Sequence, residues 1–400
     1  MNIKIKNFKL KDEINAPISK SCMQRILLAS FFSNNKISLK NKNISEDVIS
    51  LNNILEQISN KQNNNIFNCG ESAFTARTIV FVLALYYKSF IITGEKTLMQ
   101  RKIASDFDFL KNLDWKISNK NNCLPINFEN ANLISGTYII SNPETSQIVS
   151  GLLFTLPLLN GNSKIIIKNA VSLDYIFMTI NILKKFNIQI VYDLYNNNLI
   201  INIKGNQKYQ FVELAVEGDW SGTAFFLVAA AITKTINFSG LCRNSLQADK
   251  KILSIFDMAN VKYLWRKNYL TIKKSEIKAF DFDATNCPDL VPAIFVLALF
   301  ANGKSNIFGI NRLLNKESSR AKVLLEEFIK IGANIKIENN SISIIGNQKY
   351  NASVLNSHND HRIAMAEIIT AYILNNNTEI LNINCIKKSY CNFLENFFIY

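Results

Sequence analysis

Positively charged side chains recur in this sequence where a polar turn runs into an apolar, helix-like stretch. Lys20 lies between Ser19 and Ser21 just ahead of such a stretch, and Arg25 follows about one helical turn later. Free N–H groups at a helix start, two hydroxyls and an ammonium group together form a site that can bind an anion. Because a helix dipole disfavours a cation at its N-terminus, a nearby anion best explains Lys20. The alternative is a capped helix with exposed Lys and Arg side chains.

A second cluster comprises residues 316–320, which read KESSR and precede the apolar segment AKVLLEEFIKIG. Lys316 and Arg320 are four residues apart, so on a helix the two like charges would face each other at a cost of roughly a few tenths of a kcal/mol. A shared anion would reverse the sign of this interaction. A solvated turn, in which Glu317 offsets both cations, is the alternative.

Two aspartates open further helix-like stretches. Asp289 follows Pro288, and Asp360 precedes Arg362 by two residues. A carboxylate is a favourable helix cap, whereas an arginine in the first turn is disfavoured by the dipole. Arg362 is therefore another candidate for binding an anion.

Weaker candidates are residues that often have no role beyond capping or solvation. Neutral donors at a helix start can simply cap it, and basic side chains are usually exposed. The residues in this class are Thr145, Ser146, Gln147, Arg101 and Lys388.

The helix starts recur at intervals of 52 to 75 residues, which indicates repeated supersecondary units. Within the repeats, residues 107–118, 178–192, 252–265 and 323–338 change from helical spacing to alternation, as expected where an amphipathic helix enters a strand. We therefore predict an α/β protein with mixed sheets covered by helices. Three units on each side of Glu217 would give two similar domains. Several helix starts directed toward one cleft would form a polyanion site.

Composition and motifs exclude several classes of protein. The seven cysteines lack a C-x-x-C pair and there are only two histidines, which argues against a disulfide framework or a structural zinc site. The longest apolar runs are shorter than the roughly 18 to 20 residues of a membrane helix, and the start lacks a signal-peptide core, so we expect a cytoplasmic protein. No nucleotide-binding, metalloprotease or esterase motif is present. The net charge of +14 is scattered, which disfavours a nucleic-acid partner.

Eleven segments, in this order and over nearly the whole chain, resemble the enolpyruvyl transferase family. The segments are NAPISKSCMQR, CGESAFTAR, GEKTLMQRKI, ETSQ, VSLDY, EGDWSGTAFFL, GLCRNSLQAD, NCPDLVPA, NKESSRA, NDHRIAMA and KKSYCNF. The resemblance implies a two-domain inside-out α/β barrel with three βαβαββ-type units per domain. One domain would comprise residues 1–18 and 217–400 and the other residues 19–216, with the active site in the cleft between them.

The implied reaction transfers the enolpyruvyl group of phosphoenolpyruvate to the 5-hydroxyl of shikimate 3-phosphate and releases phosphate. The resemblance implies a monomer with small-molecule substrates, no metal or organic cofactor, and no nucleic-acid or membrane partner. The catalytic residues would be Asp289 as the base, Glu317 as the acid, and Lys20. Residues implied to bind shikimate 3-phosphate are Lys20, Ser21, Arg25, Thr145, Ser146, Gln147, Ser172, Asp289, Arg312 and Lys316. Those implied to bind phosphoenolpyruvate are Lys20, Ala73, Arg101, Gln147, Arg320, Arg362 and Lys388.

The sequence departs from the family pattern near the implied phosphoenolpyruvate site. Ile18 and Ala73 stand where the family has glycine, Glu71 where it has asparagine, and Ser319 where it has aspartate. We hypothesise that Ala73, with Ile18, weakens binding of glyphosate, the family's inhibitor, more than that of phosphoenolpyruvate. A degenerate member that binds anions without turnover is one alternative. Another is the branch that acts on UDP-N-acetylglucosamine, but that branch uses a cysteine in the loop matching residues 94–103, which contain none here.

Overall fold

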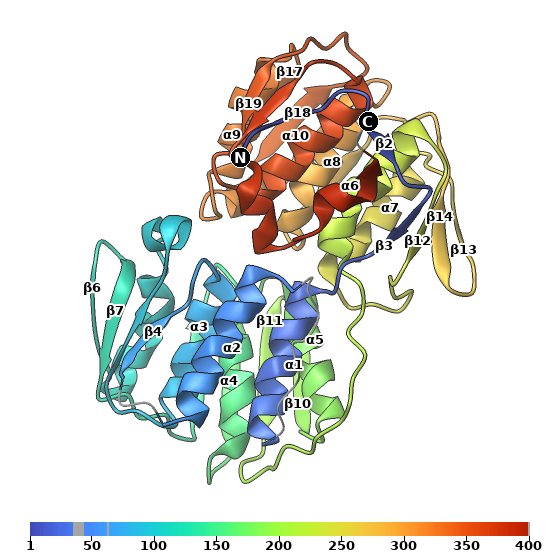
Figure 1. The fold of residues 1–400 in the computed structure, drawn as a ribbon. Coiled ribbons are helices and arrows are strands. Elements are labelled where there is room, and N and C mark those ends of the chain that lie inside the picture. Colours follow the sequence, from blue (N-terminus) through green and yellow to red (C-terminus); the bar gives the residue numbers. More distant parts are fainter. Residues whose placement is uncertain (35–43, 62–63, 399–400) are drawn as a thin grey trace. The chain divides into compact units, whose positions relative to one another are not determined.

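The chain forms two compact units. A computed structural model describes residues 1–34, 44–61 and 64–398 (Figure 1). Unit 1 comprises Met1–Ser19 and Glu217–Tyr400, and unit 2 comprises Lys20–Val216. The boundary expected from the sequence lies one residue earlier, between residues 18 and 19. Among the described residues, no helix is both long and apolar enough to cross a membrane.

Unit 2 begins with two helices and continues with two sheets that share one topology. The helices are α1 (Lys20–Phe32) and α2 (Glu46–Ser59). The first sheet has the order β4 (Ile66–Asn68), β5 (Phe90–Thr93), β7 (Cys123–Glu129) and β6 (Lys116–Lys120), and the second has the order β8 (Thr137–Ser141), β9 (Ser163–Lys168), β11 (Asn198–Ile203) and β10 (Ile190–Tyr195). In each sheet the first two strands are parallel and the other neighbours are antiparallel.

Each parallel strand pair in unit 2 is joined through a helix, as a parallel connection requires. Helix α3 (Ala73–Leu83) joins β4 to β5, and α4 (Gln147–Thr155) joins β8 to β9. Helix α5 (Leu173–Lys185) then leads to β10. The second sheet and its helices therefore follow the βαβαββ order that the family resemblance implied.

Unit 1 repeats the same sheet pattern. One sheet has the order β3 (Glu13–Asn15), β12 (Ile236–Ser239), β14 (Tyr269–Ile272) and β13 (Tyr263–Trp265), and another has the order β15 (Asp281–Asp283), β16 (Lys304–Phe308), β18 (Ser341–Ile345) and β17 (Asn334–Glu338). The smaller sheets are β19 (Val354–Asn356) with β20 (Glu379–Leu381) and β1 (Ile3–Lys4), and β2 (Lys9–Leu10) with β21 (Phe397–Phe398).

The core of unit 1 consists of three helices that are apolar on nearly every side. Helices α6 (Trp220–Thr233), α8 (Val291–Leu299) and α10 (His361–Leu374) contact one another (Figure 1). A helix that is hydrophobic all round must be buried. Helices α7 (Ile252–Met258) and α9 (Arg320–Ile329) complete the second halves of their repeats. The α/β class predicted from the sequence is confirmed.

One predicted α-helix is wrong. The segment expected to be an amphipathic helix from residue 107 forms the 3₁₀ helix η2 (Ala104–Leu113) instead. Its buried residues Ala104, Phe107 and Leu110 are three apart. Residues at this spacing eclipse one another on a 3₁₀ helix but drift apart around an α-helix. The left-handed residue Asp114 ends the segment before β6.

Candidate active site

In unit 1, three cations surround the carboxylate of Asp289, which lies in the short 3₁₀ helix η5 (Pro288–Leu290). Lys316 Nζ is 3.1 Å and Arg320 Nη1 is 2.7 Å from Oδ1, while Arg362 Nη2 is 3.6 Å from Oδ2. Arg362 Nη1 also donates a hydrogen bond to the Asp289 carbonyl oxygen at 3.1 Å. Burial alone would raise the pKa of Asp289, but Arg362, Lys316 and Arg320 together hold it well below its ordinary value. Asp289 is therefore ionised at neutral pH.

Arg320, the first residue of α9, links Asp289 to two further carboxylates. Its side chain is 1% exposed, and its Nε donates to Asp360 Oδ2 at 2.8 Å. Its Nη2 binds Glu317, whose other oxygen lies 3.6 Å from Lys388 Nζ. Burial lowers the pKa of Arg320, but Asp360, Glu317 and Asp289 outweigh that effect and raise it. The carboxylates thus compensate a cation that the helix dipole disfavours.

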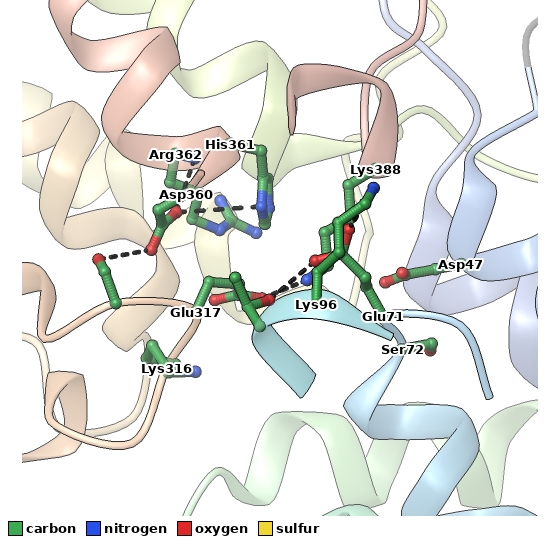
Figure 2. A network of polar contacts seen from close by, with 12 residues as sticks. Asp47, Glu71, Ser72, Lys96, Lys316, Glu317, Asp360, His361, Arg362 and Lys388 are labelled. Carbon is green, nitrogen blue, oxygen red and sulfur yellow. Dashed lines mark hydrogen bonds and ion pairs between the residues drawn. The ribbon is translucent and has the colours of Figure 1, made fainter. Parts of the chain in front are cut away.

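Figure 2 shows Lys316, Glu317, Asp360, Arg362 and Lys388 of this cluster at close range. We call the cluster formed by Asp289, Lys316, Glu317, Arg320, Asp360, Arg362 and Lys388 the unit 1 network. Within the protein, Lys316 and Arg320 both contact the Asp289 carboxylate, which offsets the repulsion between these two cations. Arg312, also expected to bind substrate, donates to the carbonyl oxygen of Thr285 at 3.2 Å.

Asp249 was not predicted as a site residue, although it lies in one of the segments that carry the family resemblance. It lies in η4 (Ala248–Lys251), is fully buried and accepts a hydrogen bond from the Ser221 hydroxyl. Burial raises the pKa of Asp249 to about 7, with Asp289 adding to the rise while Arg362 and Ser221 oppose it. No local pattern marks Asp249, because its neighbours Gln247, Lys250 and Lys251 are also polar.

Glu317, Asp360 and His361 have ligand atoms within 4.8 Å of one another, as a metal site requires. Both carboxylates, however, already bind the guanidinium of Arg320. A metal ion would have to compete with this buried cation, so the donor set fits a metal poorly.

In unit 2, Arg25 is buried between aromatic rings and hydroxyls. Its guanidinium carbon lies 4.7 Å from the Phe74 ring centroid and 5.7 Å from that of Tyr175. Its Nε donates to Thr179 Oγ1 at 2.8 Å, and its Nη1 to the Ser21 carbonyl oxygen at 2.8 Å. Burial lowers the pKa of Arg25 to about 10, so the side chain stays charged at neutral pH.

Lys20 begins α1 and forms an ion pair with Asp47 of α2, with 2.8 Å between Nζ and Oδ2. Gln24, one turn later, donates to the Asp47 carbonyl oxygen at 3.3 Å and to Ser72 Oγ at 3.0 Å. Ser72 caps α3, whose first residue is Ala73. Gln24 therefore ties the starts of three helices together, a role that its position in an apolar run did not suggest.

Of the remaining candidates in unit 2, Thr145, Ser146 and Gln147 lie at a helix start, as predicted. Gln147 begins α4, accepts a hydrogen bond from Arg77 at 3.0 Å and donates its backbone N–H to Thr145 at 3.2 Å. Ser146 is the residue before α4, and Arg101 follows η1 (Lys96–Gln100). Ser172 precedes α5 with a left-handed φ of 52°. Non-glycine residues in this region are uncommon and often mark functional sites.

The structure also shows the surroundings of Glu71. Its two oxygens lie 3.1 Å from Lys96 Nζ and 2.8 Å from Thr97 Oγ1. The carboxylate therefore holds the turn that leads to Arg101.

Comparison with known proteins identifies the family. The family model for EPSP synthase (3-phosphoshikimate 1-carboxyvinyltransferase) matches residues 5–397. The chain belongs to the EPSP synthase family. The 3-phosphoshikimate 1-carboxyvinyltransferase of Clostridium novyi is 33% identical, with 99% of this chain and 96% of the relative covered. That of Brachyspira hyodysenteriae is 34% identical, with 99% and 98% covered.

Among solved structures, an EPSP synthase from Acinetobacter baumannii superimposes with a TM-score of 0.76. Its sequence is 19% identical, and 99% of this chain and 97% of that chain are covered. This similarity confirms the fold predicted from the motifs of the family.

Proposed function

We propose that the chain transfers the enolpyruvyl group of phosphoenolpyruvate to the 5-hydroxyl of shikimate 3-phosphate, as a step of the shikimate pathway. The observation that carries this proposal is the Asp289 carboxylate, which three cations keep ionised. The match to the EPSP synthase family over residues 5–397 supports it. The two substrates carry carboxylate and phosphate groups, which need a dense set of cations.

In the proposed mechanism, Asp289 accepts the proton of the 5-hydroxyl while the hydroxyl oxygen forms a bond to C2 of phosphoenolpyruvate. Glu317 supplies a proton to the methylene carbon, which gives a tetrahedral adduct. Glu317, now ionised, then takes a proton back from the methyl group as the C2–O bond to phosphate breaks, which yields the product and inorganic phosphate. Substrate anions would compete with Asp289 and Glu317 for Lys316, Arg320 and Lys388. Fewer cations around the two carboxyl groups would raise their pKa, so that Asp289 can accept a proton and Glu317 can hold the proton that it supplies.

We assign the unit 2 candidates to the same pair of substrates. Arg25, Ser21, Thr145, Ser146 and Ser172 would bind shikimate 3-phosphate. Lys20, Gln147, Ala73 and Arg101 would serve phosphoenolpyruvate with Arg320, Arg362 and Lys388. The charge of buried Arg25 and the hydroxyls at helix starts support this assignment.

We further expect a cytoplasmic monomer that needs no metal or organic cofactor and has no nucleic-acid or membrane partner. Size-exclusion chromatography with light scattering tests the oligomeric state. Activity after dialysis against a chelator tests the metal requirement.

The function is tested by phosphate release with both substrates, one substrate alone, and neither. We expect release only with both, together with a product whose mass equals shikimate 3-phosphate plus an enolpyruvyl group. A protein that binds both acids but releases no phosphate would instead be the degenerate member considered above.

A further inference from the structure

Helix α9 carries a second buried charged residue, Glu327, two turns beyond Arg320. Glu327 is 3% exposed, and its carboxylate accepts hydrogen bonds from three groups. The donors are the Asn356 backbone N–H at 2.9 Å, His358 Nε2 at 2.8 Å and Lys330 Nζ at 2.6 Å. Two of the three donors belong to residues 356–359, which comprise the last residue of β19 and the turn that leads to α10.

This turn has a conformation that needs support. His358 and Asn359 both have left-handed backbones, with φ of 50° and 57°. Non-glycine residues adopt this conformation at a cost in free energy, so neighbouring contacts must hold them there. The backbone bond to Asn356 and the ring bond to His358 supply such contacts from one carboxylate.

The turn leads directly into the unit 1 network. Asp360 caps α10 by accepting the Arg362 N–H at 2.9 Å, and it binds Arg320 Nε at 2.8 Å. Helix α9 therefore holds this part of the chain at both ends, through Glu327 at residues 356 and 358 and through Arg320 at residue 360. A shift of the turn would move Asp360, Arg362 and the cations around Asp289.

We infer that Glu327 is a positioning residue, which through Asn356 and His358 sets the start of α10 for binding phosphoenolpyruvate. This inference rests on the proposed function. It assigns a role in the reaction to a residue that touches no proposed substrate group. Lys330, at the end of α9, binds the same carboxylate and has no hydrogen bond or ion pair with the turn among the described residues, so it provides a matched control.

The experiment compares Glu327→Gln, His358→Ala and Lys330→Met in the full chain. His358 is 37% exposed, so its truncation should leave the fold intact even if Glu327→Gln does not. We expect Glu327→Gln and His358→Ala to raise KM for phosphoenolpyruvate about fivefold, with KM for shikimate 3-phosphate unchanged. The double variant should be little worse than either single one, because both remove the same tether. Lys330→Met should leave both constants unchanged.

Hydrogen exchange provides a readout that does not depend on turnover. Peptides covering residues 356–362 should exchange faster in Glu327→Gln and His358→Ala than in wild type or Lys330→Met. Identical exchange and kinetics in all three variants would overturn the inference. If wild type released no phosphate, the proposed function would fail, while the exchange rates would still decide whether Glu327 holds the turn.

Discussion

At the scale of residues, the pKa of Asp289 is set by the three cations around its carboxylate. The cations that depress the pKa of Asp289 also contact its carboxylate, and this fixed position suits the general-base role that we propose for it. Asp289→Asn keeps the size of the side chain but removes the charge and the proton acceptor. We expect turnover to fall by about 10²- to 10⁴-fold, with shikimate 3-phosphate still bound. Phosphate release measures the loss of turnover, and calorimetry measures binding. Full activity in the variant would exclude Asp289 as the base.

The pKa of Asp249 near 7 gives a prediction about stability against pH. In the unfolded state the Asp249 carboxyl ionises near pH 3.9. Between about pH 4 and 7 this carboxyl is therefore protonated in the folded state and ionised in the unfolded state. Stability from this group is therefore fully present below about pH 4 and is lost as pH rises to 7, by up to about 1.4 kcal/mol per pH unit. Asp249→Asn should flatten this slope. Denaturant unfolding at several pH values measures it, and parallel curves for the two proteins would contradict the prediction.

Ala73 gives a prediction about inhibitor selectivity. It is the first residue of α3 and is 8% exposed, so its methyl group occupies nearly closed space. If this methyl group crowds glyphosate more than phosphoenolpyruvate, Ala73→Gly should lower the inhibition constant of glyphosate about tenfold or more, with a smaller change in KM. Inhibition kinetics of both proteins decide the matter. Tight competitive inhibition of the unaltered protein would show that the crowding does not exist.

Most members of the unit 1 network were predicted individually, but most of their contacts were not. Asp289, Glu317, Arg320 and Arg362 each stand out at a polar turn before a helix. Asp360 binds Arg320, although 40 residues of sequence separate them. This contact depends on how α9 and α10 pack, which no local sequence pattern indicates. For the same reason Glu71, read from the sequence as a carboxylate near phosphoenolpyruvate, is found bound to Lys96 and Thr97.

At the scale of elements, α10 contains a carboxyl group where an apolar residue would fit. Glu367 is fully buried, and neither of its oxygens has a hydrogen-bond partner among the described residues. Burial raises the pKa of Glu367 well above its ordinary value, with Glu327 adding to the effect. In the unfolded state the Glu367 carboxyl ionises near pH 4.3. Its contribution to the free energy of unfolding therefore falls as pH rises above that value.

Replacing Glu367 by methionine should therefore stabilise the protein at pH 7.5, by about 1–3 kcal/mol, and by less at pH 4.5. Urea unfolding at the two pH values tests this. Glu338→Gln, on the exposed face of β17, is the control and should have little effect. A loss of stability in Glu367→Met at pH 7.5 would mean that the carboxyl group has a partner or a role that α10 needs.

The elements themselves were largely predictable because each repeat contains the same local signals. Helices α1, α3, α4, α6 and α10 begin where polar turns meet apolar stretches, at Lys20, Ala73, Gln147, Trp220 and His361. The exception is η2, where a spacing of three residues between buried side chains gave a 3₁₀ helix. Whether a short apolar segment winds more tightly depends on which side chains the sheet buries, and composition alone does not determine this.

At the scale of the molecule, unit 2 is one continuous insertion in unit 1. The two crossings lie together within unit 1, where the Ser19 N–H donates to the Glu217 carbonyl oxygen at 2.9 Å and Ile18 forms a bridge with Gly218. The proposal assigns residues of both units to one pair of substrates. It therefore predicts that binding of one substrate depends on the other, since each would order groups that the other uses.

The most direct test is a calorimetric titration of phosphoenolpyruvate into the protein with and without saturating shikimate 3-phosphate, using Asp289→Asn to prevent turnover. We predict that shikimate 3-phosphate tightens the binding of phosphoenolpyruvate about tenfold or more. Equal affinity in both titrations, or no binding of phosphoenolpyruvate in either, would contradict the claim that the two units serve a single transfer reaction.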